Sequence, residues 1–173
     1  MVLETKRLLL RPFEPDDLDA LYLLLQDEEV NTFLPWFPAR DRQQAERFYQ
    51  DSFQGRPYSY AICRKDDSIP VGYIKADTGD GHELSYALRR EFWHHGIVTE
   101  AGQALIEQLK KDHVPYLTAT HDRNNPRSGG VMRQLGMRYC YSYIEQWQPK
   151  DFPVVFRTDQ PNLDGQGDPG YST

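Results

Sequence analysis

The apolar positions of this chain recur with a period near two residues in some stretches and near that of a helix in others. The first half predicts a strand at residues 6–13, a helix that opens at residues 14–17, a proline-containing loop at residues 31–40 and a second helix at residues 41–53. Pro15 favours the first turn of a helix, and the acidic residues beside it suit the positive end of the helix dipole.

The middle and second half of the chain switch repeatedly between the two periods. Runs at residues 58–64, 71–76 and 82–88 predict three strands, joined by charged or glycine-containing turns. The elements predicted after them are a helix from Ile97, a strand at residues 116–120, a helix at residues 125–136, and two strands at residues 137–147 and 152–157. This order predicts a mixed α/β (α+β) fold with a strand-helix-strand unit in the middle.

Length and composition agree with one domain. The chain has 173 residues, of which 39% are hydrophobic and 27% charged, as is ordinary for a globular protein. We expect the folded domain to span residues 1–158. Residues 159–173 are rich in Asp, Gly, Pro and Gln and predict a flexible C-terminal tail.

Charge and cysteine content narrow the classes of function. The net charge of -6 argues against a nucleic-acid partner, which usually calls for a basic excess, and is compatible with a cationic amine as substrate. No apolar run approaches the roughly 20 residues that span a membrane, and the N-terminus does not resemble a signal peptide. Two cysteines suggest no disulfide framework. We therefore expect a cytoplasmic protein without membrane or nucleic-acid partners.

The start of the helix near Ile97 poses a choice between a metal site and a phosphate site. His94 and His95 suggest a metal, whereas Gly96 at the mouth of an amphipathic helix suggests a phosphate. Adjacent histidines point in different directions on a regular element, and a helical zinc pair needs i, i+4 spacing. The sequence therefore predicts no metal.

A phosphate fits this helix start on physical grounds. The first amide groups of a helix have no partner within the helix, the dipole adds positive potential, and a glycine lets the backbone approach the ligand. A plain helix start explains the same residues. Asn125 and Ser128 likewise suit an N-cap and the matching third position of the next helix.

The two helix starts taken together resemble a known superfamily. Residues 93–101 resemble the pyrophosphate-binding motif of the GNAT N-acetyltransferases, and residues 125–137 are similar to the second motif of that superfamily. The opening, residues 4–12, resembles the branch of ribosomal-protein N-terminal acetyltransferases. The resemblance implies a single-domain GNAT fold, with a mixed, mostly antiparallel sheet that is splayed at its centre and flanked by helices.

The resemblance also implies acetyl-CoA (coenzyme A) as the cofactor, held in the gap of the sheet. Backbone groups of Ala87 and Leu88 would pair with the pantetheine arm, and the amides of residues 94–99 would hold the pyrophosphate. The cofactor-binding residues implied in this way are Ala87, Leu88, His94, His95, Gly96, Ile97, Val98, Thr99, Asn125 and Ser128.

The sequence departs from the superfamily pattern at several positions. Trp93 stands where the motif has Gln or Arg, and Val98 replaces Gly or Ala. His94 stands where this branch often has a further glycine. Many relatives carry a tyrosine as the acid four residues after the position of Ser128, and here that residue is Met132.

Amine acetylation needs a group that removes a proton from the amine and, in many enzymes, a group that protonates the leaving thiolate. Glu83 on the central strand is the first candidate for the base, and Glu145 is the second. We assign Ser128 to a hydrogen bond with the sulfur of the cofactor, with Tyr139, Tyr141 and Tyr143 as alternatives. Each of these residues also has a purely structural interpretation as a strand or surface residue.

The acceptor site is expected between the first helices and the last strand pair, with Trp36, Phe37, Glu83 and Tyr143 at its walls. The favoured acceptor is a protein or peptide N-terminal α-amino group. A small amine, such as a polyamine, amino acid or antibiotic, stays open, as does a non-catalytic acyl-CoA-binding regulatory module. The sequence leaves both a monomer and a homodimer open; Phe152 and Val155 near a sheet edge would suit a dimer.

Overall fold

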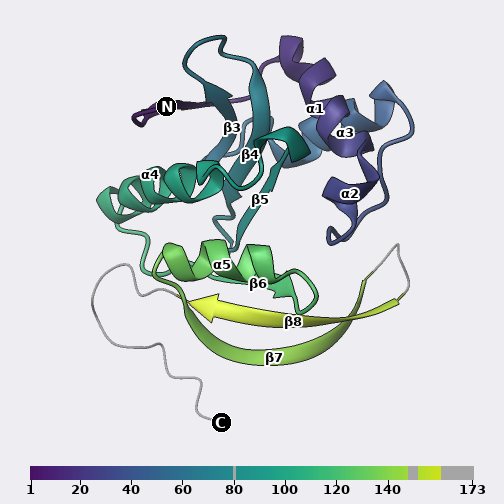
Figure 1. Cartoon of the computed structure of the whole chain (residues 1–173). Coiled ribbons are helices and arrows are strands. Elements are labelled where there is room, and N and C mark those ends of the chain that lie inside the picture. The colour runs from purple at the N-terminus through teal and green to yellow at the C-terminus, as the bar shows by residue number, and fades with distance from the viewer. Residues whose placement is uncertain (80, 148–151, 161–173) are drawn as a thin grey trace.

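The structure is a computed structural model that describes residues 1–79, 81–147 and 152–160, and for residues 145–147 and 152–160 it describes the backbone alone. Its strands form two sheets (Figure 1). The first is antiparallel, in the order β1 (Leu3–Glu4), β2 (Leu8–Arg11), β3 (Ser59–Arg64), β4 (Pro70–Ala76) and β5 (Leu84–Leu88). The second has the order β6 (Ala119–Asp122), β8 (Phe152–Gln160) and β7 (Arg138–Trp147).

The helices fall into an N-terminal and a C-terminal group. The first group comprises η1 (Pro15–Asp17), α1 (Leu18–Gln26), α2 (Glu28–Asn31) and α3 (Arg42–Ser52), and the second comprises η2 (Arg90–Phe92), α4 (Ile97–Lys111) and α5 (Pro126–Gln134). Asp41 caps α3 by accepting a hydrogen bond from the amide of Gln44 at 2.8 Å. Short polar side chains of this kind stabilise helix starts, which is why the sequence pattern places them well.

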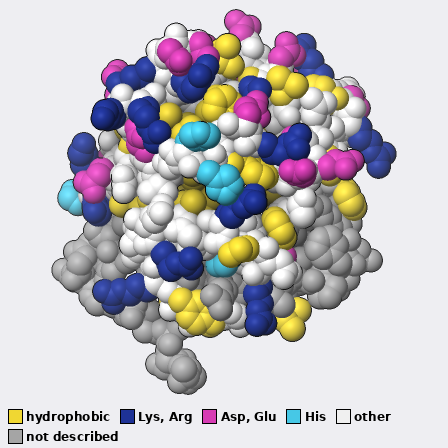
Figure 2. All heavy atoms as spheres, viewed as in Figure 1, with side chains coloured by type: hydrophobic (Ala, Val, Ile, Leu, Met, Phe, Trp, Pro, Cys, Tyr) yellow, Lys and Arg dark blue, Asp and Glu magenta, His cyan; other side chains and the backbone are white. Residues whose placement is uncertain are grey.

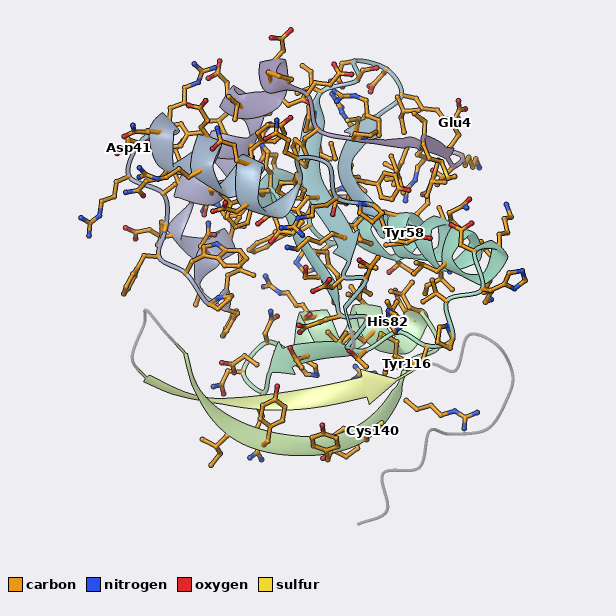
Figure 3. The ribbon with its side chains drawn as sticks, turned by 180° about the vertical axis from the view of Figure 1, so that it is seen from behind. Glu4, Asp41, Tyr58, His82, Tyr116 and Cys140 are labelled. Carbon is orange, nitrogen blue, oxygen red and sulfur yellow. The ribbon has the colours of Figure 1, made fainter. Side chains whose placement is uncertain are left out.

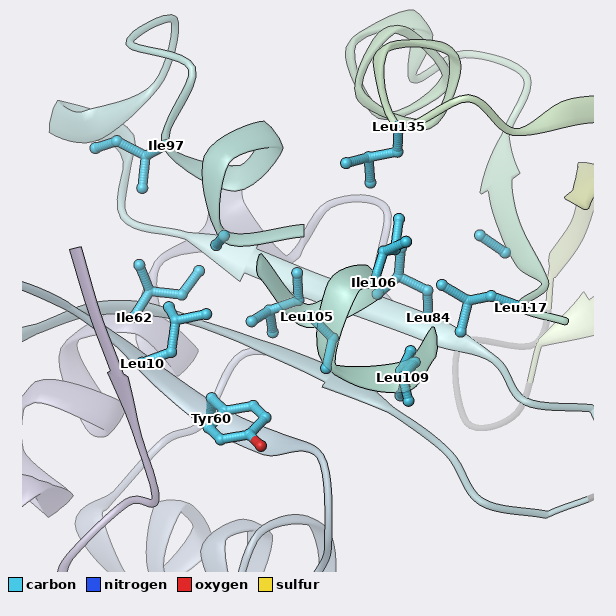
Figure 4. Close-up of a cluster of buried hydrophobic side chains, with 14 of the residues drawn as sticks. Leu10, Tyr60, Ile62, Leu84, Ile97, Leu105, Ile106, Leu109, Leu117 and Leu135 are labelled. Atoms are coloured by element: carbon cyan, nitrogen blue, oxygen red, sulfur yellow. The ribbon is translucent and has the colours of Figure 1, made fainter. Parts of the chain in front are cut away.

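Each face of the five-stranded sheet carries its own hydrophobic cluster. On one face, α4 and α5 pack on the sheet through residues such as Leu105, Leu109 and Leu135 (Figure 4). On the other, Phe13, Phe53 and Tyr73 belong to a cluster with α1 and α3. The sheet is therefore covered on both sides, as the GNAT resemblance implied, and the fold class is confirmed.

Among the differences from the sequence expectation are those at α2, β6 and β8. The short helix α2 is absent from that expectation; it forms because the Asp27 side chain accepts hydrogen bonds from the amides of Glu29 and Val30. The strand expected at residues 116–120 begins instead at Ala119, because Thr118 is occupied by a bridge to the first sheet. β8 continues to Gln160, two residues into the predicted tail.

The remainder of the predicted tail, and the side chains of Phe152 and Val155, lie outside the described residues. Within the part of the chain that the structure describes, no helix is long and apolar enough to cross a membrane. In the face shown in Figure 2, acidic and basic side chains are interspersed, so that the net negative charge does not form one continuous field there.

Candidate active site

A cleft opens where the two sheets part. β5 and β6 are joined by a parallel bridge between Glu83 and Thr118, where the amide of Leu84 donates to the Thr118 carbonyl at 2.7 Å. The rings of His82 and Tyr116 pack edge to face at this junction, 4.9 Å apart (Figure 3). Beyond it the strands belong to separate sheets, and a cavity of about 1130 Å³ lies along β5 and the starts of α4 and α5.

Most of the residues predicted from the sequence line this one cleft. They are Trp36, Glu83, Ala87, Leu88, His94, Gly96, Ile97, Val98, Thr99, Asn125, Ser128 and Tyr143. His95 and Phe37 are not among the lining residues, and both side chains are exposed. The prediction for His95 concerns its backbone amide, so the exposure of its side chain does not test it, whereas the prediction for Phe37 gains no support from the geometry.

The register of β5 decides which of its amide groups reach the cleft. Asp77 donates to the Glu83 carbonyl and Arg89 donates to the Val71 carbonyl, each at 2.9 Å, so the odd-numbered residues of this segment bond to β4. In an antiparallel ladder the intervening residues direct their amide and carbonyl groups the other way. The backbone groups of Tyr86 and Leu88 therefore face the gap.

This register corrects the prediction for Ala87. Its side chain lines the cleft, but its backbone is paired with Tyr73 on β4, so it cannot serve a ligand in the gap. Tyr86, and not Ala87, presents its backbone groups to the gap. The carbonyl of Leu88 already accepts a hydrogen bond from the indole of Trp93 at 2.7 Å, which leaves its amide for a ligand.

The start of α4 has the geometry of an anion site. Gly96 is the N-cap with φ of 69°, in the left-handed region, and no side chain caps the helix. The helix runs for 15 residues, so its first amides are unpartnered within it and its dipole is well developed. Arg127 lies over the Trp93 ring, 5.1 Å from its centroid, and brings a positive charge to this end of the cleft. These groups fit the pyrophosphate of coenzyme A.

The start of α5 faces α4 across the cleft. The Asn125 side chain accepts a hydrogen bond from the Ser128 amide at 3.4 Å, which is the N-cap contact that its local pattern predicted. Thr99 donates to the Gln134 side chain at 2.7 Å and ties the first turn of α4 to the end of α5. The start of α4 and the end of α5 are thereby held together.

Ser128 has a partner that the sequence did not reveal. The hydroxyl of Tyr86 on β5 lies 2.7 Å from Ser128 Oγ and donates to the Ser128 carbonyl at 3.0 Å. Met132, which stands at the position of the superfamily's tyrosine, is buried. Strand periodicity alone treats Tyr86 as a packing residue, and only the spatial approach of β5 and α5 brings it to Ser128.

Glu83 lies at the bridged end of β5 and its side chain is exposed. Its carboxylate accepts a hydrogen bond from the Thr120 hydroxyl at 2.9 Å. The carboxylate is exposed because the residue precedes the strand, which begins at Leu84. The other candidate, Glu145, has a side chain outside the described residues.

Two residues of β4 on the same side of the sheet are further features that the sequence reasoning missed. Lys75 is half-buried, and burial lowers the pKa of its ammonium group, partly offset by the nearby carboxylates of Asp77 and Glu83. Tyr73 is fully buried, and burial raises the pKa of its phenol. Both line the cleft, as do Asp77 and Glu83.

The aromatic wall is built by Trp36 and Tyr143. The indole of Trp36 donates to the buried Asn31 side chain at 3.1 Å, and its ring meets Phe48 edge to face at 4.9 Å. Tyr143 on β7 is half-buried in the opposite wall. The two alternative tyrosines on β7, Tyr139 and Tyr141, are about half exposed, at 57% and 49%, and do not line the cleft.

Among the described residues, no three His, Cys, Asp or Glu side chains gather in a group that could hold a metal ion. The two adjacent histidines are separated by the backbone: His94, with φ of 63°, lines the cleft, while His95 does not.

Comparison with known proteins assigns this arrangement to a family. A family model described as an acetyltransferase (GNAT) domain matches residues 7–138. The chain is 28% identical to the uncharacterized N-acetyltransferase YnaD of Bacillus subtilis (strain 168) over 144 residues, which cover 80% of this chain and 83% of that protein.

Solved structures share the fold at low sequence identity. An acetyltransferase (GNAT family) from Bacillus anthracis superposes with a TM-score of 0.83 at 21% identity, covering 94% of this chain and 99% of that one. RimL, a ribosomal L7/L12 α-N-protein acetyltransferase in complex with coenzyme A, gives 0.79 at 16% identity, covering 95% and 99%. The microcin C7 self-immunity acetyltransferase MccE, in complex with acetyl-CoA and AMP, gives 0.77 at 17% identity, covering 91% and 93%.

The family model covers well over half of the chain, and the curated relative carries the same activity in its name. The cleft offers the helix start and strand edge that a coenzyme A ligand requires. This chain belongs to the GNAT acetyltransferase family and is an N-acetyltransferase that uses acetyl-CoA.

Proposed function

We propose that this enzyme transfers the acetyl group to a primary amine, and that the favoured acceptor is a protein or peptide N-terminal α-amino group. The observation that carries the proposal is the meeting of Glu83 and Ser128 in one cleft, from opposite ends of the gap between the sheets. Glu83 stands at the acceptor side with Trp36 and Lys75, and Ser128 stands at the cofactor side with the start of α4.

Each part of the cleft has a proposed task. Bound acetyl-CoA supplies an activated acetyl group as a thioester. The amides at the start of α4 bind its pyrophosphate, and the amide of Leu88 donates to the carbonyl oxygen as negative charge develops there. Glu83 receives the proton of the attacking ammonium group, directly or through water at the exposed mouth.

The choice of acceptor rests on likeness and on chemistry. The opening residues 4–12 resemble the N-terminal acetyltransferase branch, and RimL, which is named as an α-N-protein acetyltransferase, shares the fold. MccE shares it as well and is solved with AMP, which favours a small molecule as the second candidate. A regulatory module that binds acyl-CoA without turnover is the third. Neither cysteine is in a disulfide, which suits the cytoplasmic location that we propose.

The test is thiol release from acetyl-CoA with the purified protein. The acceptors are peptides with free N-termini, the same peptides with blocked N-termini, polyamines and aminoglycosides. Turnover of free but not blocked peptides supports the proposal. Turnover of a polyamine or aminoglycoside alone selects the second candidate, and cofactor binding without any turnover selects the third.

Replacing Glu83 with Gln tests the base. We expect kcat/KM to fall by about 10²- to 10⁴-fold near neutral pH, and the loss to shrink as the pH rises, because neutral amine then becomes abundant without a base. Initial rates from pH 6 to 10 measure this. Asp77→Asn is the matched control, since it removes the same charge beside Lys75 without touching Thr120. An equal loss in both variants would assign Glu83 an electrostatic role instead.

A further inference from the structure

The hydroxyl pair of Tyr86 and Ser128 has no counterpart in the sequence motifs. The superfamily places its tyrosine on the helix that follows Asn125, where this chain has the buried Met132, whose thioether cannot donate a proton. The structure instead brings a phenol to Ser128 from another element. Tyr86 is on β5, 42 residues before Ser128, and its oxygen lies 2.7 Å from Ser128 Oγ.

Both partners are held by the fold. Tyr86 is half-buried and packs against the cluster between the sheet and α4, on the side of β5 that faces the gap. Ser128 is fixed by the N-cap contact to Asn125 and by Gly129, which lies close against the His121 ring. Ser128 and Tyr86 both line the cleft, so a ligand in the gap meets the pair from the open side.

The pair has two hydrogen-bonding arrangements. Ser128 offers the single proton of the phenol two acceptors, its carbonyl at 3.0 Å and its Oγ at 2.7 Å. When it points to the carbonyl, the serine hydroxyl donates to Tyr86. When it points to Oγ, the serine proton is released to donate into the cleft. Rotation of one hydroxyl therefore switches Ser128 from a resting donor to one aimed at a ligand.

We infer that Tyr86 and Ser128 act as one proton-donating pair toward the sulfur leaving group, in which Tyr86 replaces the proton that Ser128 gives up. This rests on the proposed acetyl transfer. The O–H bond of Ser128 breaks as its proton passes to sulfur, and the O–H bond of Tyr86 breaks as its proton forms a new O–H bond on Ser128. No electrons are exchanged with an oxidant or reductant, and the tyrosinate then regains a proton from water.

The acidity of the two groups explains why the tyrosine is needed. An aliphatic hydroxyl is a far weaker acid than a phenol, since tyrosine side chains ordinarily have a pKa near 10. Ser128 alone would be left as an alkoxide, whereas the pair leaves a phenolate. Ser128 touches the leaving group, and Tyr86 is the positioning residue that acts through it.

The first test is kinetic and uses Tyr86→Phe, Ser128→Ala and the double variant. We expect each single change to lower kcat by about 10- to 100-fold with little change in the KM for acetyl-CoA, and the double variant to be no slower than the worse single one. Tyr58→Phe is the control, because it removes a phenol that bonds Asp112 at 2.9 Å outside the cleft. If the losses in kcat of the two single variants add fully in the double variant, the two residues act independently and the inference is overturned.

The second test needs no acceptor and no turnover. Calorimetry at alkaline pH, where a larger share of the thiol is thiolate, compares coenzyme A with desulfo-coenzyme A, which lacks only the sulfur. We expect the wild type to favour coenzyme A by about tenfold, and both single variants to lose that preference while binding the desulfo compound normally. An unchanged preference in Tyr86→Phe and Ser128→Ala would refute the inference.

The two tests separate the inference from the function on which it rests. If no amine is acetylated, the proposed function fails while the calorimetric preference still shows whether the pair meets sulfur. If the wild type acetylates an amine and Tyr86→Phe keeps full kcat, the function stands and the pair is refuted.

Discussion

Gly96 shows how a single residue connects backbone geometry to binding. It begins α4 with φ of 69°, a conformation that residues with a Cβ adopt at a cost, and a Cβ there would meet only the end of the Arg7 side chain at 3.8 Å. The residue is therefore required for its conformation, which directs the first amides of α4, and not for space.

Replacing Gly96 with Ala is expected to lower stability by about 1 kcal/mol and to weaken acetyl-CoA binding by about tenfold, because relief of the strain would turn the first amides away from the cleft. Thermal unfolding and calorimetry measure the two effects.

Gly55→Ala is the matched control for this change. Gly55 has nearly the same φ, +68°, a Cβ there meets nothing within 4 Å, and the residue does not line the cleft. It should reproduce the loss of stability without the loss of affinity. If both variants bind acetyl-CoA equally well, the helix start is not the phosphate site.

At the scale of elements, the position of α5 against β6 sets the distance between Ser128 and Tyr86. Gly129 allows this contact, since a Cβ there would lie 2.8 Å from two atoms of the His121 ring. His121 is buried and its Nδ1 is 2.9 Å from the Asp122 carbonyl, so the ring has little freedom to yield. The neighbouring Gly130 has open space, its nearest contact being the end of Arg133 at 3.9 Å.

Gly129→Ala is expected to push α5 away from β6, to destabilise the protein by about 1–3 kcal/mol and to reduce kcat. Gly130→Ala, one residue along the same helix, should raise stability by about 0.5–1 kcal/mol, because alanine favours a helix and its Cβ would enter the open space of the cleft. Unfolding curves measure the stability of the two variants, and acetyl-transfer rates measure their kcat. Equal behaviour of the two would show that α5 is free to adjust.

At the scale of the whole molecule, the N-terminal segment is fastened to α4 through Glu100. Burial raises the pKa of this carboxyl, but hydrogen bonds from Thr5 and from the backbone and side chain of Arg7 outweigh it and hold the pKa below its ordinary value of 4.5. The Thr5 hydroxyl lies 2.6 Å from one carboxylate oxygen and Arg7 Nε lies 2.6 Å from the other. The charge of Glu100 thus links the segment that begins the sheet to α4, the helix that we propose binds the cofactor.

A carboxyl with a depressed pKa in the folded state contributes stability above the unfolded value, and this contribution is lost as the pH falls through the folded value. Glu100→Gln should therefore lower stability by roughly 1 kcal/mol at pH 7 and make little difference well below pH 4. Denaturant unfolding at both pH values measures this. Glu107→Gln, on the exposed face of the same helix, should lower stability less at pH 7. If Glu100→Gln loses the same stability at both pH values, the shape of the side chain matters there and its charge does not.

The sequence determined the features whose causes are local. A helix start depends on a cap, a proline or a glycine within a few residues, and for this reason the local pattern alone places Asp41, Gly96 and Asn125 correctly at the starts of their helices. Strand alternation and the two motifs likewise predict the order of elements and the family, since both are properties of short stretches of chain.

The tertiary structure decided what depends on register and on approach between distant elements. Only the pairing of β4 with β5 shows that Tyr86, and not Ala87, turns its backbone to the gap, because a shift of one residue reverses the direction of every amide. Only the packing of α5 beside β5 brings Tyr86 to Ser128, and only the bridge at the end of β5 leaves Glu83 exposed. These contacts join residues far apart in the chain, so no local pattern in the sequence specifies them.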